Sequence, residues 1–252
     1  MQVNNEKLEI DIRLAQTTAL ASIRTTVEAL IELITNVDDS YERISIKTNE
    51  KNYKHKPCII NYKLGGNNEP SYLEILDRAE GQTYEELNSN LVMGRYASNE
   101  SSRGFWGRGL KDISVHGRVT LKTIKNNKYT EVAFSLNDGS KDFKYKDQVP
   151  SPSQLKDLGL KKNKNGTKVE FTINKHGSIT HSYYETCVKN LQAHFMLKNI
   201  MHEQNGTLKI VMKDMNKKNE QNTLAYRPPK FKKTIFNDYI TSQQIEEYNK
   251  FY

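Results

Sequence analysis

The stretch that decides the fold lies at residues 32–40 and reads ELITNVDDS. Its polar residues Glu32, Asn36 and Asp39 recur at steps of four and three, which places them on one face of a helix. These three side chains could simply form a solvent-exposed polar face of the helix. Asparagine, however, is a weak helix former, and Asn36 follows the apolar run of residues 30–34 closely. If these polar side chains are partly buried, they need hydrogen-bonding partners.

Apolar residues continue the helical pattern around this stretch. From Arg13 to Tyr41 they recur every three or four residues, and no Gly or Pro interrupts them. The pattern predicts one long amphipathic helix over residues 13–41.

A carboxylate ends the second strand of a predicted hairpin. Two short apolar runs at residues 58–62 and 72–76 flank the sequence GGNN at 65–68, which is typical of a hairpin turn. Asp77 follows the second run directly. Its carboxylate either caps the following turn or accepts a hydrogen bond from a ligand such as adenine, with Gly81 letting the backbone approach a flat ring.

A glycine-rich loop follows the hairpin. Thr83 and Glu86 have the spacing of a capping box, which predicts a short helix that runs to about Met93. Residues 94–109 are rich in Gly, Ser, Asn and Arg and have no periodicity. Loops of this length without secondary structure are uncommon and often form lids over a binding site.

The end of this loop is a candidate phosphate site. Residues 104–111 read GFWGRGLK and lead into a predicted helix. The amides of Gly104, Gly107 and Gly109, the helix N-terminus and Lys111 could together hold phosphate. The spacing fits neither the Rossmann fingerprint nor the Walker loop, because no Gly-Lys-Ser/Thr occurs, and the kinase sequence His-Arg-Asp is also missing.

The rest of the chain predicts strands more often than helices. Apolar runs between turn sequences and one helical repeat predict strands over 118–124, 129–136, 167–173 and 207–212, and helices over 110–115 and 181–201. Gly166 and Thr167 begin one of these strands and by themselves indicate only a turn. From Lys213 onward the chain is basic, Asn-rich and interrupted by two prolines, as in a connection.

The order of elements predicts an α+β fold. We expect a two-layer sandwich with a mostly antiparallel sheet and helices on one face, forming a single domain over residues 1–225. Residues 226–252 are expected to be a basic tail or the start of a further, missing region. At 252 residues and 36% hydrophobic composition, the chain is long enough for one sizeable core.

Composition narrows the class of protein further. No apolar stretch approaches the roughly 18 to 20 residues of a membrane span, and the polar start lacks a signal peptide, so a soluble cytoplasmic protein without membrane contact is expected. Cys58 and Cys187 have no partner at zinc-finger spacing, which excludes a disulfide framework and a cysteine-based metal site. A net charge of +8 and a pI of about 9.2 favour polyanionic partners such as nucleotides or nucleic acid, although lysine runs are also explained as solvated surface.

Taken in order, four of these segments resemble the motifs of the GHKL superfamily, which includes gyrase, the heat-shock-ninety chaperones, histidine kinases and MutL. Residues 32–40 resemble its Glu-Leu-x-x-Asn-x-x-Asp-Ala motif, with Ser in place of the last Ala. Residues 77–83 are similar to Asp-x-Gly-x-Gly-x-Thr, with Ala79 in place of the first Gly. Residues 104–111 resemble the lid end of MORC-type members, and Gly166-Thr167 the late Gly-Thr motif. The resemblance covers roughly residues 13–212 and implies the Bergerat ATP-binding fold.

The resemblance implies a site for ATP and Mg²⁺. Glu32 would be the base for the attacking water, and Asn36, one turn later, would hold the metal with its side-chain oxygen. Asp77 would bind the adenine amine, with Gly81 and Thr167 completing that end of the site. The other nucleotide-binding residues implied by the motifs are Asp39, Thr83, Gly104, Gly107, Gly109, Leu110 and Lys111.

The resemblance also suggests how such a site would work. Residues 84–109 would form a lid that brings Gly107, Gly109 and Lys111 onto the phosphates. No phosphoacceptor helix pair precedes the motifs, which favours an ATPase of the heat-shock-ninety-like or MORC-like branch over a histidine kinase. The transducer domain that usually supplies a lysine is not expected in residues 226–252, so we expect slow turnover, control of an attached or partner effector, and a nucleotide-dependent homodimer.

Two alternatives remain open at the sequence level. The chain could be a basic nucleic-acid-binding module in which the glycine motifs are only turns; that would need aromatic residues alternating with Lys or Arg on one sheet face. Tyr129, Phe134 and Phe171 do not form such a set. The second alternative is a catalytically inactive ATP-binding scaffold of the same fold, which differs only in hydrolysis.

Overall fold

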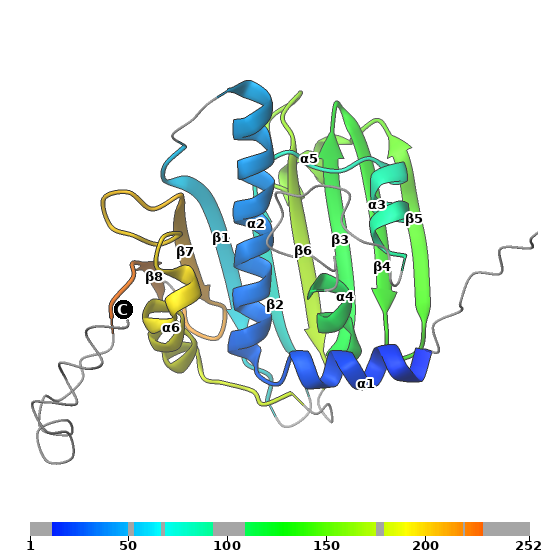
Figure 1. Cartoon of the computed structure of the whole chain (residues 1–252). Helices are drawn as coiled ribbons and strands as arrows, with labels where there is room; N and C mark the ends of the chain where they lie inside the picture. The colour runs from blue at the N-terminus through cyan, green and yellow to red at the C-terminus, as the bar shows by residue number, and fades with distance from the viewer. Residues whose placement is uncertain are drawn as a thin grey trace, which may run out of the picture.

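One sheet forms the rear layer of the protein, and most of its helices lie in front of it (Figure 1). The computed structural model describes residues 12–49, 53–66, 69–92, 109–174, 179–218 and 220–228. Its helices are α1 (Ile12–Ser22), α2 (Thr26–Thr48), α3 (Tyr84–Asn90), α4 (Gly109–Ile113), α5 (Pro152–Asp157) and α6 (Tyr184–Ala193), with 3₁₀ turns η1 (Ser114–His116) and η2 (Phe195–Leu197). Its strands are β1 (Lys56–Lys63), β2 (Ser71–Asp77), β3 (Gly117–Lys125), β4 (Lys128–Ser135), β5 (Ser140–Gln148), β6 (Gly166–Ile173), β7 (Leu208–Asp214) and β8 (Gln221–Leu224).

The eight strands form one sheet in the order β5-β4-β3-β6-β2-β1-β7-β8. Only the β1–β7 pair is parallel among the strands described, and every other neighbouring pair is antiparallel. Alternate residues of β2, such as Leu73 and Ile75, are buried against the helices, as expected for a sheet with one covered face. The predicted α+β sandwich with a mostly antiparallel sheet is confirmed.

The long helix α2 lies across the middle of the sheet (Figure 1). Its buried residues Leu30, Ile34 and Val37 belong to the same core cluster as Ile60 of β1 and Leu73 of β2. Full burial of an aliphatic side chain contributes roughly 1.5–3 kcal/mol before entropy is counted. This apolar face fixes the rotation of α2, and thereby fixes where its polar stripe points.

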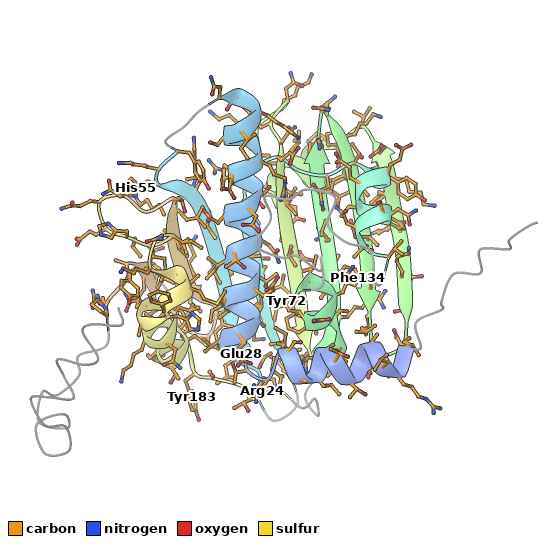
Figure 2. All side chains as sticks on the ribbon, viewed as in Figure 1. Arg24, Glu28, His55, Tyr72, Phe134 and Tyr183 are labelled. Atoms are coloured by element: carbon orange, nitrogen blue, oxygen red, sulfur yellow. The ribbon has the colours of Figure 1, made fainter. Side chains whose placement is uncertain are left out.

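The prediction of one helix over residues 13–41 was wrong, because the chain breaks before Thr26. The hydroxyl of Thr25 accepts from the backbone N–H of Glu28 at 3.1 Å, and the Glu28 carboxylate accepts from the N–H groups of Arg24 at 2.6 Å and Thr25 at 3.0 Å. This capping box satisfies the first donors of a new helix, so α1 and α2 are separate. Figure 2 labels Arg24 and Glu28 at the corner where the two helices meet.

The strands were predicted more accurately than the helices. The predicted hairpin is β1–β2, and the four other predicted strands are β3, β4, β6 and β7. The capping box at Thr83 is present and starts α3. The helix predicted over 181–201 was too long, since α6 ends at Ala193 and His194 is extended with ψ 123° before η2 begins.

Three elements had no counterpart in the prediction. Strand β5 is the polar edge strand, and β8 lies in the segment that was interpreted as a connection from Lys213 onward. Helix α5 covers one corner of the other sheet face, where Leu158 and Leu160 pack with Ile124 and Tyr129. The helices are therefore on one face except for this short one.

Among the described residues, no helix has the length and apolarity that crossing a membrane requires. Cys58 in β1 and Cys187 in α6 are both buried and free.

Candidate functional site

The polar stripe of α2 forms one side of the candidate site. The Asn36 amide donates through Nδ2 to Glu32 Oε1 at 3.2 Å. Among the described residues nothing donates to Asn36 Oδ1, and this side chain is exposed. The amide is thus held with its nitrogen toward Glu32 and its oxygen toward solvent, an orientation in which the oxygen is available to a cation.

Glu32 is a carboxylate with an unusual environment. Burial raises its pKa; the hydrogen bond from Asn36 opposes this shift, and the negative charges of Asp112 and Asp39 add to it. A carboxylate that is desolvated and faces other carboxylates is a stronger base than an exposed one. Asp39 itself is 6% exposed and interacts with other residues of the fold.

Gly109 lies in close contact with the side chain of Glu32. A Cβ on Gly109 would lie 1.6 Å from Glu32 Oε1, so the backbone at the start of α4 lies directly against this carboxylate. Leu110 packs on the main core cluster beside it. The structure therefore brings together the α2 stripe and the end of the glycine-rich segment, as the motifs imply.

Lys111 is buried and bonded to backbone carbonyl groups. It is 4% exposed, and its Nζ donates to the carbonyl oxygens of Asn90 at 3.1 Å and Val92 at 2.9 Å, at the end of α3, so a phosphate contact by Lys111 stays a prediction. Lys111 also lines a cavity of about 320 Å³ between α1, α4 and the β4–β5 strands. No residue of α2 or of the Asp77 loop lines this cavity, so the cavity is separate from the candidate site.

Asp77 is buried at the end of β2, and only one of its two carboxylate oxygens accepts hydrogen bonds from the described residues. Its Oδ1 accepts from the backbone N–H groups of Ala79 at 2.8 Å and Thr167 at 3.2 Å. Within the described part of the chain, Oδ2 accepts no hydrogen bond. Gly166 lets β6 approach, because a Cβ there would lie 2.6 Å from the Asp77 carbonyl oxygen. One carboxylate oxygen is thus fixed by the backbone, and the other is left for a donor.

The environment of Asp77 also changes its acidity. Burial raises its pKa to about 6, although the hydrogen bonds from Ala79 and Thr167 and the charge of Arg43 oppose the shift. An unfolded aspartate has a pKa of about 3.9, so the carboxylate at pH 7 is ionised at a free-energy cost to the fold.

The residues after Asp77 have structural roles of their own. Gly81 has φ +68°, and a Cβ there would lie 2.1 Å from the carbonyl oxygen of Ile124. The Thr83 hydroxyl accepts from the N–H of Glu86 as the cap of α3. Both residues are explained by the fold, and a ligand contact by either stays a prediction.

Replacing Gly81 with alanine is expected to lower the free energy of unfolding by about 2–4 kcal/mol, since it adds a clash to a left-handed backbone. Gly159→Ala is the matched control. Gly159 has φ +60° but nothing lies within 4 Å of its Cβ position, so only the strain of about 1 kcal/mol remains. Urea denaturation of both variants measures the difference. Equal losses would show that the packing against β3 is not tight.

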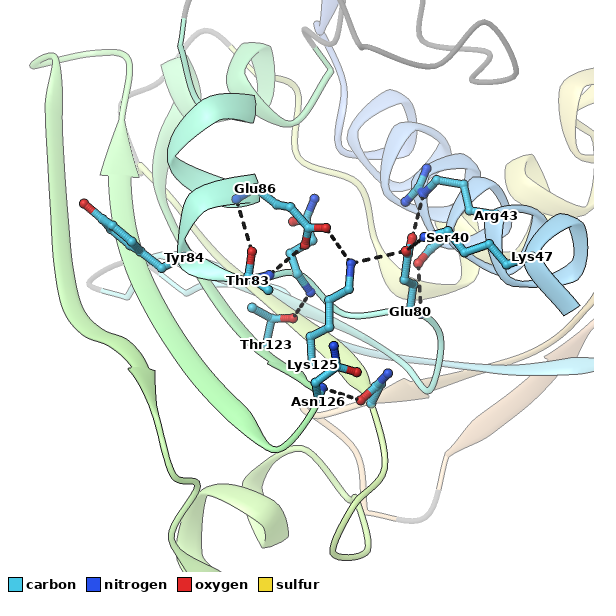
Figure 3. Close-up of polar contacts among 12 residues, drawn as sticks. Ser40, Arg43, Lys47, Glu80, Thr83, Tyr84, Glu86, Thr123, Lys125 and Asn126 are labelled. Carbon is cyan, nitrogen blue, oxygen red and sulfur yellow. Dashed lines mark hydrogen bonds and ion pairs between the residues drawn. The ribbon is translucent and has the colours of Figure 1, made fainter.

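The sequence did not reveal the cluster of charges around Glu80 (Figure 3). The Glu80 carboxylate pairs with Arg43 Nε at 3.1 Å, with Lys125 Nζ at 3.2 Å, and with Lys47. Burial would raise the pKa of Glu80, but hydrogen bonds from Lys47 and Arg43 and the charge of Lys125 lower it to about 2. Arg43 and Lys47 continue the α2 stripe at four-residue steps, a signal that was present in the sequence.

The candidate site extends along α2, with different contacts at its two ends. The Glu32 end of the helix lies against Gly109, and the other end lies against the loop after Asp77, where Ser40 accepts from the N–H of Glu80 at 3.4 Å. Arg43 lies eleven positions after Glu32, which is about 16 Å along a helix. Gly104 and Gly107 lie outside the described residues.

The comparisons with known proteins concern the fold. No family model matches the sequence, and no curated protein matches it. Among solved structures, the chain is similar to the ATP-binding domain of topoisomerase IV from Francisella tularensis in complex with a small-molecule inhibitor. The TM-score is 0.52 and the identity 19%, over 87% of this chain and 96% of that one. The chain therefore shares its overall fold with that ATP-binding domain. Membership of the GHKL superfamily, and the closer likeness to MORC or heat-shock-ninety proteins, stay predictions.

Proposed function

We propose that the protein binds ATP with Mg²⁺ between α2 and the loop after Asp77, and hydrolyses it slowly. The observation that carries the proposal is the Asp77 carboxylate, which is buried, is fixed through Oδ1, and leaves Oδ2 for a donor. The exocyclic amine of adenine is such a donor, and its hydrogen bond to an ionised acceptor would be strong. Thr167 supports this end of the site through its backbone contact with Asp77.

The other end of the site fits a metal-bound triphosphate. No group of three or more His, Cys, Asp or Glu side chains in the described ranges could hold a metal by itself. Mg²⁺ often binds through one or two protein oxygens while phosphates and waters complete its shell, so a single ligand from Asn36 Oδ1 fits this ion. Bound there, Mg²⁺ would neutralise phosphate charge. Glu32, whose pKa is raised by burial, would take the proton of the attacking water.

The glycine-rich segment would contact the phosphates. Gly109 and Leu110 begin α4 beside Glu32, which supports the predicted role of their amides. Lys111 donates to the carbonyl oxygens of Asn90 and Val92, so it would have to exchange these contacts to reach phosphate. We propose that closure of residues 84–109, including Gly104 and Gly107, makes this exchange.

Nucleotide binding would also affect association of the protein with other chains or domains. We propose that lid closure favours a homodimer and controls an attached or partner effector, in the manner that the resemblance implies. Asp39 lies near Glu32 and would contribute to the metal end through water.

A nucleic-acid-binding module is the second candidate, and β5 is the observation that favours it. Lys144 lies 5.3 Å from the ring centre of Tyr145, and Lys146 lies 5.1 Å from that of Tyr84. These rings also pack on other rings: Tyr84 on Phe143 at 4.8 Å and Tyr145 on Tyr129 at 5.5 Å. Bases need open ring faces for stacking, so ATP is the better supported ligand.

Titration calorimetry separates the two functions. With Mg²⁺ present, ATP should bind with one site per chain and GTP should bind more weakly, because the 6-oxo group of guanine offers Asp77 no donor. A single-stranded 20-mer should leave the ATP isotherm unchanged. Binding of the oligonucleotide by a protein that gives no heat with ATP would contradict the proposal, and binding of ATP without turnover would identify an inactive scaffold.

The pH dependence gives a further test. Because burial raises the pKa of Asp77 to about 6, ATP affinity should fall by about tenfold between pH 7 and pH 5, as the ionised acceptor becomes the minor form. In the ligand-free protein the sign is opposite. A carboxylate with a raised pKa destabilises the fold above that pKa, so its contribution to stability improves as pH falls from about 6 toward 4.

Asp77→Asn is the control for both trends, since an amide does not titrate. Subtracting its profile removes the titration of the ATP phosphates and of other groups. A difference profile that is flat between pH 5 and pH 7 would show that Asp77 does not titrate in this range or does not bind the nucleotide.

A further inference from the structure

We propose that Glu80 is a positioning residue for base recognition: it ties the loop after Asp77 to α2 and β3 and keeps Arg43 away from the Asp77 carboxylate. This inference rests on the proposed function, because it concerns how the same site selects adenine.

The Glu80 side chain joins three separate elements. Arg43 and Lys47 reach it from α2, and Lys125 reaches it from the end of β3. The side chain of Glu80 is only 11% exposed. Pairs at this depth are screened less by water and salt than pairs on the open surface. The carboxylate therefore acts as the common anchor of three cations rather than as one half of a surface pair.

The other polar anchors of the loop are single hydrogen bonds. The backbone N–H of Arg78 donates to Tyr41 Oη at 3.0 Å and that of Glu80 to Ser40 Oγ at 3.4 Å, both on α2, while that of Gln82 donates to Thr123 Oγ1 of β3 at 2.8 Å. Each of these bonds connects the loop to one neighbour only. The Glu80 side chain contacts both neighbours at once, so it fixes the separation between α2 and β3 on either side of the loop.

Arg43 is the cation that could disturb recognition. It reaches from α2 to Glu80, three residues after Asp77 in the same loop, and its charge opposes the rise that burial causes in the pKa of the Asp77 carboxylate. Its Nε is engaged by Glu80 at 3.1 Å. Without this partner, the guanidinium would be free to turn toward Asp77 and pair with Oδ2, the oxygen that adenine would use. Arginine forms strong pairs with carboxylates, so the base would then compete with a cation of the protein itself.

The same cluster continues into the first helix after the loop. Lys125 Nζ also pairs with Glu86 at 2.6 Å, and Glu86 caps the N-terminus of α3 through Thr83 (Figure 3). The chain of contacts from α2 to α3 therefore passes through Glu80 and Lys125. Loss of Glu80 would leave Lys125 paired with Glu86 and would remove the carboxylate partner of Arg43 and Lys47.

The test compares base selectivity rather than affinity. ATP and the triphosphate of purine riboside, which lacks the 6-amino group, are titrated in the presence of Mg²⁺ into wild type and Glu80→Gln. Wild type should prefer ATP by about tenfold or more, because the analogue leaves Asp77 without a donor. Glu80→Gln should lower this preference to about threefold or less. Adding Arg43→Gln to Glu80→Gln should restore most of the preference.

Two controls make the result decisive. Glu69→Gln removes an exposed carboxylate that pairs with Lys63 in the β1–β2 hairpin, and it should leave the preference unchanged. Glu80→Asp keeps the charge but shortens the reach; if Glu80→Gln does not fold, this variant should show a smaller loss of preference. A preference that is unchanged in both Glu80 variants, with ATP and the analogue weakened equally, would overturn the inference and leave the proposed function standing. Wild type that fails to bind ATP would overturn both.

Discussion

Replacing Asp77 with asparagine is expected to weaken ATP binding by about 10- to 150-fold, or about 1.5–3 kcal/mol. Backbone N–H groups fix Oδ1 of this buried carboxylate, and Oδ2 is the acceptor that we assign to the adenine amine. In asparagine one of these positions must be an NH₂ group. Either the amide faces the backbone N–H groups of Ala79 and Thr167, or it presents a donor to a donor on the base.

Calorimetry with ATP and Mg²⁺ measures this loss, and a thermal melt shows whether the variant is folded. Asp142→Asn is the matched control, since Asp142 lies on the edge strand β5 in an exposed pair with Arg118. It should bind ATP like wild type. A folded Asp77→Asn protein that also binds ATP as tightly as wild type would contradict the assignment.

The second large effect is expected from Glu32. Glu32→Gln should reduce ATP turnover by at least about 100-fold, because the isosteric amide cannot accept the proton of water. The affinity for Mg-ATP should change little, since the proton transfer occurs only in the transition state. Asn36→Ala should have the other phenotype and weaken the part of ATP binding that depends on Mg²⁺.

Single-turnover rates and calorimetry with and without Mg²⁺ separate these two roles. Glu42→Gln, on the same helix and outside the stripe, is the control for loss of a charge. Equal losses of binding in the Glu32 and Asn36 variants would contradict this division. Because the two side chains are hydrogen-bonded to each other, the double variant should also be measured to detect coupling between them.

The sequence predicted the sheet well where strands are buried on one face and bounded by turns. Residues 58–62 and 72–76 alternate in burial as β1 and β2, and this alternation is visible in the sequence. The sequence did not predict the strand whose apolar alternation is interrupted by charged residues. Strand β5 carries Lys141, Lys144 and Lys146 because it is an edge strand, and such charges blunt an open edge.

The helix break before α2 was predictable from the residues. Thr25 and Glu28 have the same capping-box spacing that correctly marked Thr83 and Glu86, but the apolar periodicity continued through them. An apolar repeat of three to four residues can continue through a break between two helices, so it does not show where the chain changes direction. The different directions of the two helices, α2 along the strands in front of the sheet and α1 crosswise at their lower end, result from tertiary packing (Figure 1).

Some residues of the candidate site could be identified from the sequence and others could not. The sequence pointed to four of them, because a polar residue or a glycine at these positions suggests a binding role: Glu32, Asn36, Asp77 and Gly109. The cluster at Glu80 could not be identified, since its members come from α2, the loop and β3, and only folding brings them together. The contacts of Lys111 with the carbonyl oxygens of Asn90 and Val92 were likewise not visible in the sequence, because only folding brings these residues together.

A crystal structure with Mg²⁺ and a non-hydrolysable ATP analogue would show whether the nucleotide binds between α2 and Asp77. The adenine amine should lie within about 3 Å of Asp77 Oδ2. An Mg²⁺ ion should lie about 2.1 Å from Asn36 Oδ1, with the phosphates between it and the start of α4. A nucleotide bound elsewhere, or one whose base does not contact Asp77, would contradict the proposed ATP site.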